Sequence, residues 1–181
     1  MTSGAEQGCR ASHEAALRAF LDSDAALALV LEDDVSAIDG DAIEGIASDI
    51  EARPGWGVAH LSRPVLGFRS AWGTSGDMRL YRAHLFPMTT AALLWSRDGA
   101  EGFLANGPDW PMDHALRHWA LGARMGIGFD RPLVDTHPFA SEILDREALI
   151  DASYERHRAR LRLRQKAQAT WNRARWRFTA R

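Results

Sequence analysis

Three adjacent carboxylates, Glu32-Asp33-Asp34, follow directly after the apolar run Ala25–Leu31. A run this short and wholly apolar predicts a strand buried on both faces, as in a parallel sheet covered by helices. Carboxylates gathered where a buried strand reaches the surface repel one another unless a cation or hydrogen-bond donors lie beside them. Because open α/β sheets bind ligands at the carboxyl ends of strands, the sequence predicts a site here.

Oxygen ligands of this kind suit a hard divalent cation such as Mn²⁺ or Mg²⁺, which commonly shares them with phosphate oxygens. Such a cation would neutralise the charge that develops on a diphosphate leaving group. In this interpretation Asp34 is one ligand and Glu32 or Asp33 another. The alternative is a solvated acidic turn in which Asp33 or Asp34 caps nearby N–H groups.

Two motifs carry a resemblance to a known family. The first is Gly8-Cys9-x-x-Ser12-His13, and the second, after a short helix, is Ala28–Val35 with its three carboxylates. Together they resemble glycosyltransferase family 25, which includes bacterial lipopolysaccharide β-galactosyltransferases. Further segments similar to that family follow in the same order: Thr89–Ser96 with Gly99-Ala100, Pro111-Met112-Asp113, Pro132–Val134 and Ser141–Ile143.

The resemblance implies a GT-A-like nucleotide-sugar-binding fold, with a mixed sheet flanked by helices. It also implies metal-assisted, inverting transfer of a hexose, galactose being the expected one, from a UDP-sugar. The expected acceptor is a hydroxyl of a lipopolysaccharide or related surface glycan, presented as a glycolipid or oligosaccharide. The implied cofactor is Mn²⁺, with Mg²⁺ as the substitute.

The resemblance also implies roles for individual residues. The donor-binding residues are Ser12, His13, Glu32 and Asp33; the metal ligands are Asp34, Glu32 and His137; the general base is Asp113. A purely structural role as a helix cap is an equally good interpretation of Asp113, because the helix dipole favours a carboxylate at a helix start. His137 is otherwise a loop histidine that hydrogen-bonds a neighbour.

Two alternatives to the transferase are weighed. The family has a strand and a helix before its first motif that hold part of the uridine site, whereas here the motif lies close to Met1. A truncated, non-catalytic family 25-like fragment is therefore one alternative, to which the unusual Thr89-Thr90-Ala91-Ala92 also points. A metal-dependent phosphoester hydrolase that uses the same acidic cluster is the other.

Alternating helix and strand patterns around these motifs predict an α/β layered domain over residues 1–144. Helices are expected at 11–21, 41–51, 97–104 and 111–122, with Ser12, Asp39 or Asp41, Ser96 and Pro111 at their starts. In the first helix the buried stripe is predicted to be Ala15, Ala16, Ala19 and Phe20. Further strands are expected at 56–61, 90–95 and 125–129, with a hairpin or loop at 62–88 and a loop at 131–139.

Residues 145–181 are predicted to form an Arg-rich helical tail. From residue 151 onward the net charge is +8, whereas the preceding 150 residues carry −10. The tail either docks on the acidic body or contacts an anionic membrane peripherally, and no recognised module accompanies its charge, so no nucleic acid is expected. With one cysteine, no long apolar run and no signal-like start, the expected location is the cytoplasm, with a peripheral position at the inner face of the membrane as the alternative.

Overall fold

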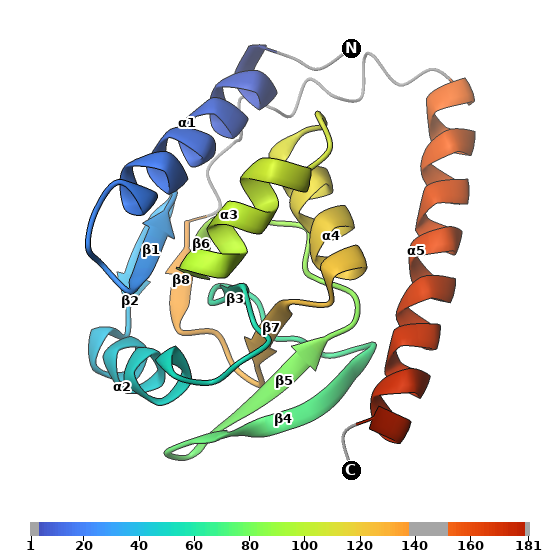
Figure 1. Ribbon diagram of the computed structural model, residues 1–181. Coiled ribbons are helices and arrows are strands. Elements are labelled where there is room, and N and C mark those ends of the chain that lie inside the picture. Colours follow the sequence, from blue (N-terminus) through green and yellow to red (C-terminus); the bar gives the residue numbers. More distant parts are fainter. Residues whose placement is uncertain (1–3, 138–151, 180–181) are drawn as a thin grey trace.

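The structure, a computed structural model, describes residues 4–137 and 152–179 (Figure 1). Its helices and strands, in chain order, are α1 (Gly4–Leu21), β1 (Leu27–Leu31), β2 (Val35–Ile38), α2 (Gly40–Glu51), β3 (Val58–His60), β4 (Arg69–Ser75), β5 (Met78–Ala83), β6 (Ala92–Ser96), α3 (Arg97–Asn106), α4 (Met112–Ala123), β7 (Gly126–Phe129), β8 (Val134–Thr136) and α5 (Ala152–Thr179). The predicted segment Ser141–Ile143 and the predicted boundary between residues 144 and 145 lie outside the described residues.

The larger sheet has six strands in the order β1-β6-β3-β7-β5-β4. Strands β3 and β7 are parallel, and the other four neighbouring pairs are antiparallel. Strands β2 and β8 form a separate two-stranded antiparallel sheet. The prediction of an α/β fold with a mixed sheet flanked by helices is therefore confirmed.

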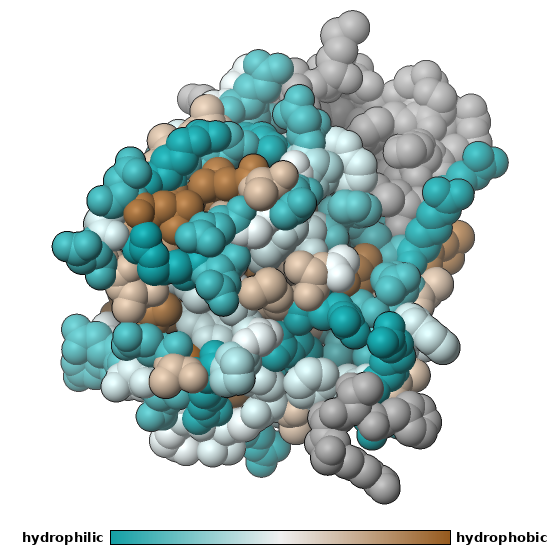
Figure 2. All heavy atoms as spheres, viewed as in Figure 1, coloured by the Kyte–Doolittle hydropathy of each residue, from teal (hydrophilic) through white to brown (hydrophobic). Residues whose placement is uncertain are grey.

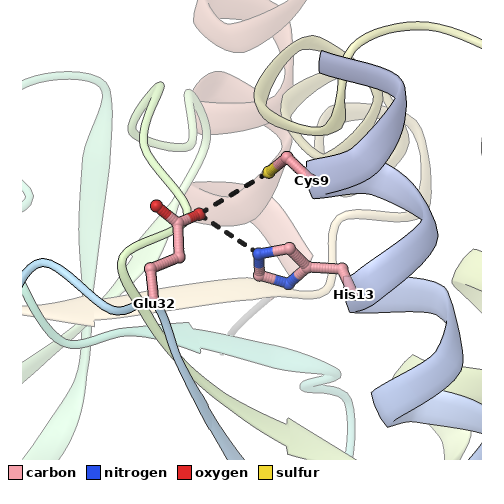
Figure 3. Close-up of side chains that lie close together, drawn as sticks. All are labelled: Cys9, His13 and Glu32. Atoms are coloured by element: carbon pink, nitrogen blue, oxygen red, sulfur yellow. Dashed lines mark hydrogen bonds and ion pairs between the residues drawn. The ribbon is translucent and has the colours of Figure 1, made fainter. Parts of the chain in front are cut away.

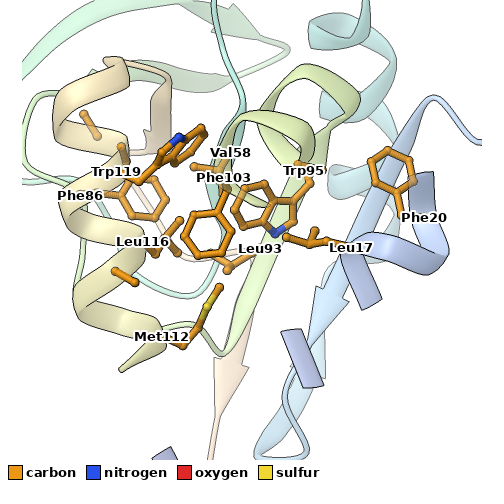
Figure 4. Packing of buried hydrophobic residues seen from close by; sticks show 14 of the residues in the cluster. Leu17, Phe20, Val58, Phe86, Leu93, Trp95, Phe103, Met112, Leu116 and Trp119 are labelled. Carbon is orange, nitrogen blue, oxygen red and sulfur yellow. The ribbon is translucent and has the colours of Figure 1, made fainter. Parts of the chain in front are cut away.

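Each face of the large sheet packs against its own hydrophobic core. Helices α1, α3 and α4 cover one face, where the ring centroids of Trp95, Phe103 and Trp119 lie 5.5–6.0 Å apart (Figure 4). Helix α2 and the small sheet cover the other face. Burial of large aromatic rings between helices and sheet supplies much of the apolar area that stabilises the fold.

Capping residues set the starts of two helices as predicted. The side chain of Asp39 accepts a hydrogen bond from the Ala42 N–H at the start of α2, and that of Ser96 accepts one from the Gly99 N–H at the start of α3. Gly99 also packs directly on the backbone of Gly57, and a Cβ there would overlap the Gly57 carbonyl. This close approach holds the first turn of α3 against β3.

The prediction that residues 25–31 form a strand buried on both faces in a parallel sheet is wrong. Strand β1 lies at the edge of the large sheet and pairs antiparallel with β6. Its Leu29 and Leu31 side chains are 40% and 37% exposed, because only α1 covers this end of the sheet well. The strands that are buried along all or nearly all of their length are β3, β6 and β7, which have neighbours on both sides.

The predicted start and buried face of the first helix also need correction. Helix α1 begins at Gly4, so Ser12 lies inside it and is not an N-cap. Its buried residues are His13, Leu17 and Phe20, whereas Ala15 and Ala19 are exposed. The helix is rotated this way because burying Leu17 and Phe20 removes more apolar area from water than burying alanines would.

Two short strands were not predicted. The segment 131–139 was expected to be a loop, yet β8 lies within it and pairs with β2. Because β2 and β8 are short and far apart in the sequence, neither has a local pattern that distinguishes it from a loop.

The segment 62–88, expected to be a hairpin or loop, contains the hairpin of β4 and β5.

The basic C-terminal segment forms helix α5, which packs against α4 and β4. The amide of Asn172 donates a hydrogen bond to the buried Leu121 carbonyl at 3.0 Å. The Arg82 guanidinium carbon lies 5.1 Å from the centre of the Trp176 ring, and burial lowers the pKa of Arg82 to about 10. Within the described residues, no helix is both long enough and hydrophobic enough to span a bilayer.

Candidate functional site

Cys9 and His13 stand one helical turn apart on α1 and project from the same side of that helix. Glu32 is the first residue after β1, the strand on which α1 packs. Figure 3 shows Cys9 and His13 pointing toward the Glu32 carboxylate. The first two motifs of the sequence therefore meet in space.

Three side chains contact the same oxygen of the Glu32 carboxylate. His13 Nε2 lies 3.2 Å from Glu32 Oε1, and Cys9 Sγ lies 3.9 Å from the same atom. The Thr90 hydroxyl, just before β6, also donates to Oε1. Burial raises the pKa of the Glu32 carboxyl, but these hydrogen bonds and the His13 charge outweigh it, so the pKa lies below its usual value.

The Cys9 thiol is the weaker acid of the pair that it forms with Glu32. Burial, followed by the negative charge of Glu32, raises the pKa of Cys9 to about 11. Asp113 contributes to the same increase through its charge, so its carboxylate lies near this group of side chains. In the absence of a cation, Cys9 is therefore a neutral hydrogen-bond donor at physiological pH.

Asp34 is a half-buried carboxylate beside two other negative charges. Burial raises its pKa, and the charges of Glu32 and Asp33 raise it further. Its Oδ1 atom is buried and has no hydrogen-bond partner among the described residues. Its backbone carbonyl accepts a hydrogen bond from the His137 N–H at 2.8 Å, which places the end of β8 beside the acidic cluster.

The remaining predicted residues lie around this core. Asp33 and Ser12 are exposed, and Ser12 neighbours His13 on α1. Asp113 is half-buried in the first turn of α4, where its Oδ1 accepts the His114 N–H at 2.8 Å. The exposed His137 follows β8. The structure thus joins His13 to Glu32 by a side-chain contact and Asp34 to His137 by a backbone contact.

The group of potential metal ligands that the fold brings closest together differs from the predicted set. Within residues 4–137 and 152–179, the ligand atoms of Cys9, His13 and Glu32 lie within 4.8 Å of one another, and Asp33, Asp34 and His137 do not belong to this group. Cys9 was not among the predicted site residues. The signal for it was the i, i+4 spacing of Cys9 and His13, which places both on one helix face.

An open pocket of about 380 Å³ lies beside α1. Several of its lining residues are neighbours of Cys9 and His13 along the chain. Its lining residues are Glu6, Gln7, Arg10, Ala11, Glu14, Asp109, Trp110 and Pro111. Arg10 connects its two sides, because its guanidinium bonds Glu14 of α1 and the carbonyls of Pro108 and Trp110. The pocket wall therefore ends close to Asp113, two residues beyond Pro111.

In comparisons with known proteins, no protein-family model, curated protein or solved structure matches this chain.

Proposed function

We propose that this protein is a GT-A-like hexosyltransferase that moves a sugar, galactose by preference, from a UDP-sugar to a hydroxyl of a lipopolysaccharide or related surface glycan. The proposal includes a divalent cation, Mn²⁺ or Mg²⁺, and inversion at the anomeric carbon. The resemblance of residues 8–143 to glycosyltransferase family 25 suggests it, and the geometry at the end of β1 supports it.

The observation that carries the proposal is the convergence of separate segments on Glu32. Side chains of Cys9 and His13 from the first motif and Thr90 from the third segment all contact Oε1 of Glu32, which belongs to the second motif. Asp34 of the same motif contacts the backbone of His137. These contacts join segments that the resemblance assigns to one site, which supports the proposal.

The acidic cluster fits the implied cation. The buried, unpartnered Oδ1 of Asp34 and the raised pKa of that carboxyl mark a place where positive charge is lacking. Asp34, with Asp33, Glu32 and the nearby His137, would hold Mn²⁺ or Mg²⁺, and the oxygen donors suit such hard ions. When bound, the cation would neutralise negative charge on the diphosphate leaving group.

The other residues would position and deprotonate the reactants. His13 and Thr90 hold one oxygen of Glu32, which fixes its carboxylate toward the donor site, and Ser12 borders that site from α1. Asp113 would accept the proton of the acceptor hydroxyl as it attacks the anomeric carbon and the bond to the UDP oxygen breaks. The pocket beside α1, whose lining ends at Pro111, would hold the acceptor.

We also propose that α5 contacts an anionic membrane that carries the acceptor. Arg162, Arg164 and Lys166 are exposed on it, and Leu163 and Trp171 are 68% and 60% exposed. Figure 2 shows hydrophilic residues interrupted by a few hydrophobic ones along this side. Arginines beside exposed apolar side chains suit an anionic lipid surface. Cosedimentation with phosphatidylglycerol vesicles, but not with phosphatidylcholine vesicles, is the expected result, and equal binding to both would contradict it.

The test of the reaction is UDP release from UDP-galactose in Mn²⁺, with and without a lipopolysaccharide-derived oligosaccharide. We expect acceptor-dependent release that falls by about 10²–10⁴-fold in Asp113→Asn. The matched control is Asp24→Asn, which removes an exposed carboxylate ahead of β1 and should leave the rate unchanged. Release of inorganic phosphate without acceptor would favour the hydrolase, and no release from any UDP-hexose would refute the transferase.

A further inference from the structure

We propose that Cys9, His13 and Glu32 form a second metal site, which shares Glu32 with the proposed Mn²⁺ site and binds a thiophilic divalent cation, with Zn²⁺ as the best match. The three ligand atoms lie within 4.8 Å of one another at the junction of α1 and β1 (Figure 3). Glu32 is common to both proposed sites, whereas Cys9 and His13 take the place of Asp33, Asp34 and His137 here. The inference does not depend on the proposed transferase activity.

The ligand types favour zinc. A thiolate, an imidazole and a carboxylate are the three side chains that bind Zn²⁺ in proteins, whereas Mn²⁺ and Mg²⁺ prefer oxygen ligands throughout. Three protein ligands leave the fourth tetrahedral position for water or another small ligand, which is the ligand count of catalytic zinc sites. Cys9 is the single cysteine of the chain, so the site holds one sulfur at most.

Two of the three distances between the ligand atoms are close to those of a tetrahedral site. Zinc bond lengths imply edges of about 3.3–3.6 Å between neighbouring nitrogen, oxygen and sulfur ligands. The observed separations are 3.2 Å from His13 Nε2 to Glu32 Oε1 and 3.9 Å from Cys9 Sγ to the same oxygen. The ligand atoms of Cys9 and His13 lie within 4.8 Å of each other. Side-chain shifts of up to about 1 Å would therefore bring all three ligand atoms to zinc distances.

His13 and Cys9 can both adopt the protonation states that metal ligation requires. His13 is 4% exposed, and its Nδ1 has no hydrogen-bond partner in the part of the chain that the structure describes. No bond there fixes Nδ1 as an acceptor, so it can carry the ring proton and leave the Nε2 lone pair for the metal. Cys9 would release its proton to solvent. The thiolate and the Glu32 carboxylate then balance the two positive charges of the ion.

Cobalt titration of the full chain tests this site without any activity assay. After chelation and dialysis, we expect Co²⁺ to bind with one equivalent, to give a thiolate-to-metal charge-transfer band and to be displaced by Zn²⁺. Because the chain has one cysteine, that band reports on Cys9 alone. Binding should be accompanied by release of about one proton.

Variants of Cys9 and His13 distinguish cobalt binding at this site from binding elsewhere on the protein. Cys9→Ser, which is nearly isosteric, should abolish the band, and His13→Gln should weaken cobalt binding by at least the roughly 10–100-fold seen when metal-supporting residues are lost. His118→Gln, an exposed histidine on α4, is the matched control and should bind normally. Circular dichroism establishes that each variant is folded. No thiolate band in the folded wild-type protein, or an unchanged band in Cys9→Ser, would overturn the proposal.

Discussion

His13 Nε2 lies 3.2 Å from Glu32 Oε1, and this contact joins the middle of α1 to the first residue after β1. The same oxygen accepts hydrogen bonds from Cys9 and Thr90, so one carboxylate connects α1, β1 and the segment before β6. Since β1 is an edge strand, these hydrogen bonds supply part of what holds α1 over this end of the sheet.

Replacing Glu32 by alanine should therefore destabilise the fold. His13, Cys9 and Thr90 would lose their shared acceptor, and unsatisfied groups of this kind cost about 1–3 kcal/mol. Urea denaturation should show a lower midpoint at an unchanged slope. Asp33→Asn, the exposed neighbouring carboxylate, is the control and should stay within about 0.5 kcal/mol of the wild type. Equal stability of Glu32→Ala and the wild type would mean that this carboxylate does not hold α1 in place.

His60 should make the protein sensitive to mild acid. Its ring is fully buried, with Nε2 bonded to the Thr89 carbonyl and Nδ1 to the Arg63 N–H, and burial lowers its pKa from 6.5 to about 4. Between these values the unfolded chain binds a proton that the folded chain does not. The stability present above pH 6.5 is thus lost as the pH falls toward 4, and burial lowers the pKa of His84 to about 4 with the same effect.

Urea denaturation between pH 7 and pH 4.5 measures this effect. His60→Asn should be less stable at pH 7 but should lose less stability as the pH falls. His118→Gln, in which the replaced ring is exposed, should follow the wild-type curve. If the His60→Asn and wild-type curves ran parallel, the buried neutral state of His60 would be wrong.

Comparing these side chains with the sequence shows which features were predictable. Ser96 was predicted as a cap, and Asp39 was one of two candidate caps beside Asp41, because capping depends on residues that are three positions apart. The edge position of β1 was not predicted, because the same apolar run suits a strand with one neighbouring strand and a strand with two. Local sequence likewise does not show which side chains meet at the site. Glu32 and His13 were both predicted as site residues, but their contact and the inclusion of Cys9 depend on the rotation of α1 about its axis on the sheet.

Asn172 should contribute measurably to the docking of α5. Its amide donates to the Leu121 carbonyl in a buried position, and Asn172→Ala leaves that carbonyl without this donor. We expect a loss of about 1–3 kcal/mol in the free energy of unfolding, measured by urea denaturation. Thr170→Ala, on the exposed side of the same helix, should change it by less than about 0.5 kcal/mol. Similar losses in both variants would contradict the observed docking.

The central claim is that the carboxylates after β1 bind a divalent cation that also contacts the phosphates of a nucleotide. Electron paramagnetic resonance of Mn²⁺ tests it most directly, because bound ion loses the sharp signal of free ion. With UDP present, the wild-type protein should bind one equivalent of Mn²⁺, Asp34→Asn should bind at least tenfold more weakly, and Asp24→Asn should bind normally. A free-ion signal that the folded wild-type protein leaves unchanged, with or without UDP, would contradict the claim.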